Sequence, residues 1–293
     1  MQIECVVDSH SQTGEGAVWD DAAQRLYWVD IPAGLVHRFD PASGRNESCA
    51  LDEDVACLAV RESGGLVIAT RSGFHFLDFE TGGKHPIVDP EAHLTEHRFN
   101  DGTTDPRGRF WAGTMKDRGK PAAAGCFYRL DPDLRCHAWE SGFFTTNGLA
   151  FSPDGRTMYL SDSHASVRTI WACDYDLDDG FPSNRRVFFD TSAVAGRPDG
   201  GTVDADGCYW MAGVSGWQLV RLTPSGTIDR IIDMPVERPS KPMFGGANLD
   251  TLYVTSIANG LTPGSEGRQK QAGGLFAITG LGVKGLPQTR FAG

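Results

Sequence analysis

The sequence lacks any cluster of lysine and arginine residues, and it lacks long apolar runs. Its formal net charge is −11 over 293 residues, so the basic surface that binds nucleic acids or anionic membranes is missing. No apolar stretch approaches the roughly 18 residues of a membrane span, and the N-terminus has no leader-peptide pattern. We therefore expect a cytoplasmic protein that binds neither nucleic acid nor membrane.

Two kinds of chemical motif are also missing. The seven cysteines are odd in number and never spaced as CxxC, which argues against a disulfide framework or a cysteine zinc site. No GxSxG elbow is present, so Ser161-Asp162-Ser163-His164 is interpreted as the end of a strand rather than as part of a nucleophilic triad.

What is present is a repeated unit. An apolar strand, an Asp-Gly turn and a second strand rich in Tyr, Trp and Met occur at 147–162 and again at 199–213. Asp-Gly supplies the positive φ that a tight hairpin needs. Alignment of the units places six residues in one register at intervals of about 41 to 52: Trp19, Val60, Thr104, Phe151, Val203 and Phe244.

Four-strand repeats of this length are typical of propellers. The sixth unit lacks a clean outer strand, whereas the strand at 3–8 has no unit before it. We therefore predict an all-β, six-bladed β-propeller with four-stranded blades, one domain over 1–293, whose ring is closed by the N-terminal strand. A solenoid is less consistent, because neither end supplies a polar cap.

The residues just before the innermost strands should stand at the mouth of the central channel. Four positions before each register residue the sequence has Glu15, Ala56, Asn100, Asn147, Asp199 and Ser240. Any one Asp or Asn there is an ordinary turn residue. Four oxygen donors in one register instead indicate a site for Ca²⁺ or Mn²⁺, with Zn²⁺ also compatible.

The same segments carry a family resemblance. The longest are GEGAVWD (14–20), RFNDGTTDPRGRFWAGTM (98–115), TTNGLAFSPDGRTMYLSDS (145–163) and RPDGGTVDADGCYWMA (197–212). They resemble the SMP-30/gluconolactonase/regucalcin family of sugar lactonases. The resemblance implies one divalent metal cation held by Glu15, Asn147 and Asp199. It also implies lactone contacts from Arg98 and Asn100, and we add the adjacent Asp101 as a candidate.

The predicted activity is hydrolysis of a sugar (aldono-) lactone to the aldonic acid. A cation that polarises the carbonyl and activates water suits this reaction, and Asp199 is the candidate proton acceptor. The alternatives are a non-catalytic propeller that binds calcium or a sugar, and a hydrolase for a phosphotriester or a homoserine-type lactone. The expected partner is a small-molecule sugar lactone, and the protein is expected to be a monomer or a small homo-oligomer.

Substrate charge is a further question. Animal family members carry acidic residues after the GTM motif, whereas this chain has Lys116-Asp117-Arg118-Gly119-Lys120. Lys241 follows Ser240 at the predicted channel mouth. We expect either a solvated loop or a pocket for an anionic lactone, with Arg118 as the best candidate to hold the anionic group because its planar fork makes paired hydrogen bonds.

Overall fold

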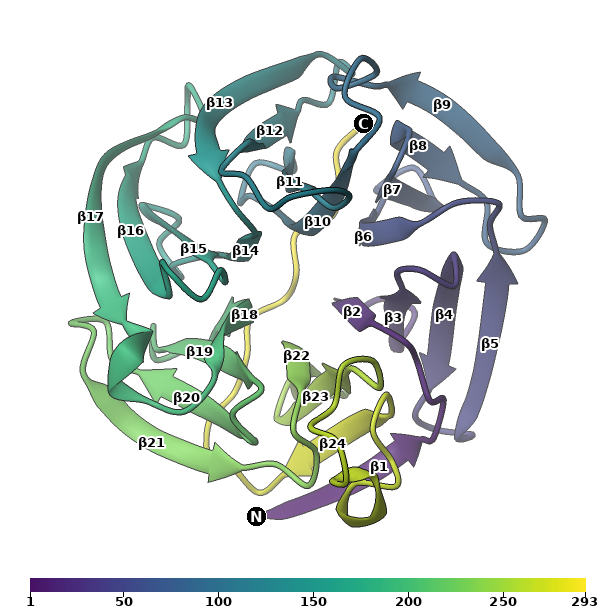
Figure 1. Ribbon diagram of the computed structural model, residues 1–293. Coiled ribbons are helices and arrows are strands. Elements are labelled where there is room, and N and C mark those ends of the chain that lie inside the picture. Colours follow the sequence, from purple (N-terminus) through teal and green to yellow (C-terminus); the bar gives the residue numbers. More distant parts are fainter.

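Six four-stranded sheets make up the protein. The computed structural model describes residues 1–293, and each sheet is antiparallel. Figure 1 shows the sheets arranged around a central channel as the blades of a propeller. The predicted six-bladed all-β fold is therefore confirmed.

The strands nearest the channel supply the functional positions. They are β2 (Gly14–Asp20), β6 (Val55–Val60), β10 (His97–Thr104), β14 (Thr146–Phe151), β18 (Arg197–Val203) and β22 (Pro239–Gly245). We number the blades one to six in this order. Each of these strands contacts the innermost strand of the next blade, and β2 contacts β22.

Strands further from the channel become progressively more exposed. The second strands are β3 (Arg25–Asp30), β7 (Leu66–Thr70), β11 (Phe110–Lys116), β15 (Thr157–Asp162), β19 (Tyr209–Val214) and β23 (Thr251–Ser256). The third are β4 (Leu35–Asp40), β8 (Gly73–Leu77), β12 (Gly125–Leu130), β16 (Thr169–Tyr175), β20 (Gln218–Leu222) and β24 (Leu275–Thr279). The outermost are β5 (Arg45–Ala50), β9 (Lys84–Val88), β13 (Cys136–Phe143), β17 (Pro182–Asp190), β21 (Ile228–Asp233) and β1 (Gln2–Val7).

This gradient explains the sequence pattern. Second strands such as β19 are buried at every position, because neighbouring blades cover both faces of the sheet. Outer strands such as β17 have mostly exposed side chains. The fold adds only two short 3-10 helices, η1 (Thr191–Ala193) and η2 (Glu266–Arg268). It contains no helix of the length and apolar character needed to cross a membrane.

The N-terminal strand closes the ring. β1 pairs antiparallel with β24, with Gln2 opposite Thr279 and Ile3 opposite Ile278. The sixth blade thus combines the first strand of the chain with its last three, as the sequence predicts. Closure of this kind leaves no free end at which the blades could separate.

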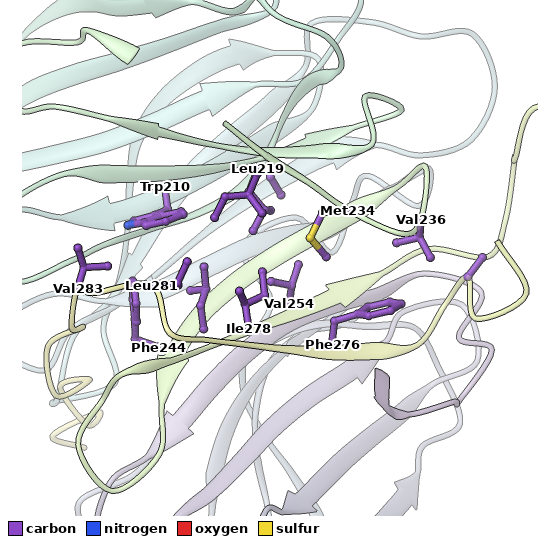
Figure 2. Close-up of a cluster of buried hydrophobic side chains, with 14 residues drawn as sticks. Trp210, Leu219, Met234, Val236, Phe244, Val254, Phe276, Ile278, Leu281 and Val283 are labelled. Carbon is purple, nitrogen blue, oxygen red and sulfur yellow. The ribbon is translucent and has the colours of Figure 1, made fainter. Parts of the chain in front are cut away.

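Apolar clusters hold neighbouring blades together. Figure 2 shows the largest, in which Trp210 and Leu219 of blade five meet Phe244 and Phe276 of blade six. All four side chains are at most 1% exposed. Burial of each large apolar side chain contributes about 1.5–3 kcal/mol, so the interface between blades is a main source of stability.

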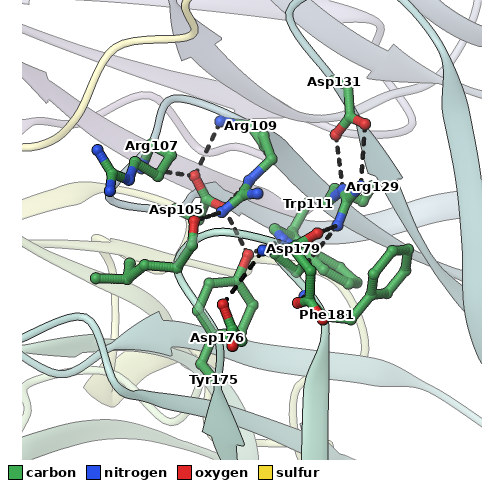
Figure 3. Close-up of polar contacts among 12 residues, drawn as sticks. Asp105, Arg107, Arg109, Trp111, Arg129, Asp131, Tyr175, Asp176, Asp179 and Phe181 are labelled. Atoms are coloured by element: carbon green, nitrogen blue, oxygen red, sulfur yellow. Dashed lines mark hydrogen bonds and ion pairs between the residues drawn. The ribbon is translucent and has the colours of Figure 1, made fainter.

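A polar network joins blades three and four at the far ends of their innermost strands (Figure 3). Asp105 accepts hydrogen bonds from the Tyr175 hydroxyl at 2.5 Å and from the backbone of Arg109 at 3.0 Å. Arg129 donates to the Gly180 carbonyl at 2.6 Å and to Asp131 at 2.6 Å. These groups are paired with one another and carry no free reactive atom.

The C-terminal segment crosses the same end of the channel (Figure 1). Lys284 and Gly285 hydrogen-bond to the loops at Ala205 and Leu249. Phe291 donates to the Val60 carbonyl at 2.8 Å. The hollow at this end is lined by residues such as Thr104, Leu149, Phe244 and Pro287, none of which titrates. The candidate residues selected from the sequence lie toward the opposite end, where the innermost strands begin.

Candidate functional site

Every innermost strand is interrupted by a bulge at the same position. The pairing with the second strand shifts after Glu15, Val55, Phe99, Asn147, Pro198 and Pro239. A bulge adds an unpaired residue and changes the direction of the side chains next to it. The positions chosen by register thus lie inside the strands at these bulges, which corrects the expectation that they precede the strands.

Glycine permits the bulge in two blades. Gly16 and Gly148, directly after Glu15 and Asn147, have φ values of 60° and 69°. These values lie in the left-handed region that glycine adopts without steric cost. A Cβ on Gly148 would also come within 2.6 Å of the Tyr209 hydroxyl. The glycines therefore set the direction in which Glu15 and Asn147 project.

Glu15 is 6% exposed, and its carboxylate is only half satisfied. Its Oε2 accepts a hydrogen bond from the Gly16 amide at 2.9 Å, whereas its Oε1 is buried without a partner. Burial raises the pKa of Glu15 well above its usual value, and the negative charges of Asp199 and Asp101 raise it further. A buried anionic oxygen with no donor is an acceptor for an added cation.

Asn147 is held in one orientation by two neighbours. Its Nδ2 donates to Ser163 Oγ at 2.6 Å, and its Oδ1 accepts from Asn100 Nδ2 at 3.1 Å. Ser163 in turn donates to the carbonyl of Pro198, next to Asp199. An amide oxygen has two lone pairs, so one remains available beside the Asn100 contact.

Asp199 is 7% exposed, and neither of its oxygens accepts a hydrogen bond from the protein. Burial, followed by the negative charge of Asp101, raises its pKa to about 7, and Arg238 and Arg197 oppose the rise. Glu15 and Asp199 thus disfavour each other's negative charge. A divalent cation would relieve both effects, because it places positive charge between two carboxylates.

The donor set fits a metal that prefers oxygen. No group of three or more His, Cys, Asp and Glu side chains suited to a metal is found, and the set at the channel mouth combines two carboxylates with one amide oxygen. Ca²⁺ and Mn²⁺ accept such mixed oxygen ligands, and Zn²⁺ accepts carboxylates. The seven cysteines are all free thiols and lie outside this set.

Arg98 and Asn100, both in β10, lie next to the three candidate metal ligands. Arg98 Nη1 donates to Asn100 Oδ1 at 2.8 Å, and its Nε donates to Asp117 at 3.1 Å. Asp117 also accepts from Arg71 Nη2 at 2.6 Å. Arg98 is therefore held in one orientation, and its charge is paired with that of Asp117.

Asp101 and Lys241 are paired with each other. Lys241 Nζ lies 2.8 Å from Asp101 Oδ1, and Asp101 Oδ2 accepts from the Leu149 amide at 2.9 Å. The two residues come from blades three and six, on opposite sides of the channel. Neither charge is free for a ligand in this arrangement, although both were predicted as substrate contacts.

The basic loop follows β11 and adjoins the site through Asp117. Lys116 pairs with Glu96 at 2.8 Å. The Arg118 side chain is exposed and takes part in no hydrogen bond or ion pair, and only its backbone amide donates to Glu96, at 3.2 Å. The residue of this loop that reaches the site is Asp117, through Arg98.

Sequence reasoning did not find Ser163 or Asp117 as parts of the site. Ser163 follows the second strand of blade four, where its hydroxyl meets the amide of Asn147. The pairing of the two strands places Ser161, not Ser163, opposite Asn147. The contact therefore depends on how the chain turns after Asp162, and the strand register carries no signal for it.

A family model matches most of the chain. Residues 13–258 match the family model described as the SMP-30/gluconolactonase/LRE-like region. The chain belongs to this family. The resemblance seen in the motifs is thereby confirmed, and sugar-lactone hydrolysis is the activity that the family supports.

Two curated relatives match over nearly their whole length. A 6-deoxy-6-sulfogluconolactonase of Pseudomonas putida is 37% identical over 295 residues, which cover 99% of each chain. Regucalcin of Xenopus laevis is 35% identical over 298 residues, covering 100% of this chain and 99% of the relative. A solved structure of a calcium-binding protein, regucalcin from Agrobacterium tumefaciens, has a TM-score of 0.92 at 27% identity, with 98% and 96% coverage.

Proposed function

We propose that this protein is a metal-dependent hydrolase that opens a sugar lactone to the aldonic acid. The observation that carries the proposal is the buried set of Glu15, Asn147 and Asp199, in which one oxygen of Glu15 and both oxygens of Asp199 lack a protein partner. Relatives named as a sulfogluconolactonase and as regucalcin support the same assignment.

Glu15, Asn147 and Asp199 would hold one divalent cation, either Ca²⁺, Mn²⁺ or Zn²⁺. When bound, such a cation polarises the lactone carbonyl and lowers the pKa of a water molecule. The calcium-binding description of the Agrobacterium protein supports a divalent metal here. The hydrogen bond that Asn147 Nδ2 donates to Ser163 Oγ keeps the amide of Asn147 in its orientation, so that its oxygen faces the set.

The residues around the set account for the other parts of hydrolysis. Asp199 accepts a proton from the attacking water, whose oxygen bonds to the carbonyl carbon. The ring C–O bond then breaks, and the leaving oxygen takes the proton from Asp199 to become a hydroxyl, which returns Asp199 to its ionised form. Arg98 and Asn100 orient the sugar hydroxyls, because they are fixed by each other and by Asp117.

The experiment is a panel of neutral and anionic sugar lactones followed with a pH indicator. The metal-free protein is assayed with chelator and then with added Ca²⁺, Mn²⁺ or Zn²⁺. We expect turnover that chelator abolishes and at least one cation restores. Turnover that is the same with and without chelator would exclude the metal-dependent reaction.

A second candidate is a calcium-binding propeller without catalysis, favoured by the description of the Agrobacterium relative. It predicts tight Ca²⁺ binding by Glu15 and Asp199 together with no hydrolysis of any lactone in the panel. The same assay, combined with calorimetric titration of Ca²⁺, therefore separates the two functions.

A further inference from the structure

One register position at the rim of the channel carries arginine in three blades. The channel-mouth register positions are Glu15, Ala56, Asn100, Asn147, Asp199 and Ser240, and two residues before each of them the chain has Thr13, Asp54, Arg98, Thr145, Arg197 and Arg238. Arg197 is the first residue of β18, and Arg238 directly precedes β22. These two strands are neighbours around the channel, so Arg197 and Arg238 stand side by side in register at the rim.

The arginine of blade three differs from the other two in its partners. Arg98 pairs with Asp117 at 3.1 Å, and Arg71 connects Asp117 to Asp54. Neither Arg197 nor Arg238 forms an ion pair with any carboxylate. The only side-chain hydrogen bond of Arg238 goes to the carbonyl of Asn259, and its Nε is buried without a partner.

Both arginines lie close to Asp199 and to each other. The positive charges of Arg238 and Arg197 hold down the pKa of Asp199, against the effects of burial and Asp101. Burial lowers the pKa of Arg238. The negative charges of Asp199 and Glu237 oppose this shift, and the positive charge of Arg197 adds to it. The carboxylates close to them are Glu237 and the candidate metal ligand Asp199, and neither forms an ion pair with them. An anion that joined the two guanidinium groups would offset the repulsion between them.

A count of charges at the channel mouth also singles out Arg197 and Arg238. Lys241 matches Asp101, and Arg71 and Arg98 match Asp54 and Asp117. A divalent cation would match Glu15 and Asp199. Arg197 and Arg238 then face one further carboxylate, Glu237, which lies close to Arg238 and accepts hydrogen bonds from Thr262 and Gln269. One positive charge therefore remains in a protein whose net charge is −11.

We propose that Arg197 and Arg238 form an anion subsite for a carboxylate, sulfonate or phosphate group of the sugar lactone. The inference rests on the proposed function and adds the substrate class to it. A guanidinium presents a planar fork that holds such a group by two parallel hydrogen bonds. The subsite lies next to Asp199, so the anionic group and the metal-bound carbonyl would belong to one substrate molecule.

The test compares a neutral lactone with its anionic counterparts. Gluconolactone is assayed against analogues that carry a carboxylate, a sulfonate or a phosphate at carbon 6, and the preferred analogue identifies the anion. We expect at least one anionic lactone to have the higher kcat/KM. Arg197→Gln and Arg238→Gln should each raise KM for it by about 10- to 100-fold, the range of a charged hydrogen bond, and leave KM for gluconolactone unchanged.

Conservative and control variants separate the role of the guanidinium fork from that of charge alone. Arg197→Lys and Arg238→Lys keep the charge but lose the fork, so we expect a smaller rise in KM and an intact fold. Arg135→Gln removes an arginine whose side chain is 79% exposed, and it should change KM for neither the neutral nor the anionic lactone. Loss of the anionic preference in Arg118→Gln, with none in the Arg197 and Arg238 variants, would move the subsite to the basic loop and overturn the proposal.

A binding measurement separates this inference from the proposed function. The ring-opened product of the preferred anionic lactone is titrated calorimetrically into the metal-free protein and the two glutamine variants, and weaker binding to the variants supports the subsite. Two results would overturn the subsite: equal kcat/KM for neutral and anionic lactones, or an equal loss of kcat/KM for both in the variants. Either would mean that the arginines only offset the negative charge of Asp199. If no lactone is hydrolysed with any cation, the proposed function is wrong. The calorimetric titration of the three ring-opened analogues then tests the anion subsite independently, since weaker binding to the glutamine variants still supports it.

Discussion

The ammonium group of Lys241 lies 2.8 Å from the carboxylate of Asp101, and the pair joins blade six to blade three across the central channel. Lys241 is 2% exposed and the Asp101 side chain is fully buried. Asp101 also fixes blade four, through the amide of Leu149. This pair therefore ties three blades together beneath the candidate metal site.

Removal of Lys241 should destabilise the protein strongly. Lys241→Met leaves Asp101 buried and without a cation, a change that costs about 3–5 kcal/mol. The double variant Lys241→Met/Asp101→Asn should recover part of this loss, because asparagine is neutral and still offers an oxygen to Leu149. Urea denaturation of the three proteins measures the effect. Unchanged stability together with a raised KM would instead make Lys241 a substrate contact.

Glu15 and Asp199 should respond differently to neutral substitution. Glu15→Gln and Asp199→Asn each remove one negative ligand, so both should weaken metal binding. At saturating metal, Glu15→Gln should recover most of its kcat. Asp199→Asn should remain about 10²- to 10⁴-fold slower, the usual contribution of a general base. Assays over a metal titration test this, and full recovery of the Asp199 variant would remove its role as proton acceptor.

The sequence predicts the blades well because each one is a local unit. Buried second strands recur in every copy and Asp-Gly turns in two of them, and the register selects Glu15, Asn147 and Asp199 from segments almost two hundred residues apart. The ion pair of Asp101 with Lys241 joins side chains 140 residues apart. It depends on which side chains cross the channel, and strand periodicity carries no information on that.

The metal-free protein should lose stability as pH rises from about 4 to about 7. Carboxyl groups titrate near 4 in an unfolded chain, whereas the pKa of Glu15 is raised in the fold and that of Asp199 is raised to about 7. The folded state therefore binds these protons more tightly, and their contribution to stability declines as pH rises through this range.

A divalent cation should reverse this trend. It competes with the protons of Glu15 and Asp199, so its stabilising effect should grow with pH across the same range. Scanning calorimetry at several pH values, with chelator and with metal, measures both effects. Asp199→Asn is the control, because it should show a weaker dependence on pH. A rise in Tm on adding metal that is independent of pH would contradict the assignment.

Ser163 should act through the orientation of Asn147. Ser163→Ala removes the acceptor for Asn147 Nδ2 and frees the amide to rotate. Loss of such a supporting contact lowers metal affinity by about 10- to 100-fold. Metal titration followed by calorimetry measures this, and kcat at saturating metal should be nearly unchanged. Ser163→Thr, which keeps the hydroxyl, should restore the affinity, whereas unchanged affinity in Ser163→Ala would exclude this positioning role.

The C-terminal segment should stabilise the ring without affecting the site. Phe291 is fully buried in the apolar cluster of blades two and three, and its amide hydrogen-bonds to Val60 at the end of β6, remote from the bulges that hold the metal ligands. Phe291→Ala should lower the unfolding free energy by about 3–5 kcal/mol and leave kcat and metal affinity of the folded protein unchanged. Leu286→Ala is the matched control, because Leu286 is 36% exposed and its loss should cost much less. A loss of metal affinity in Phe291→Ala, measured well below its unfolding temperature, would show instead that the tail is coupled to the site through the channel.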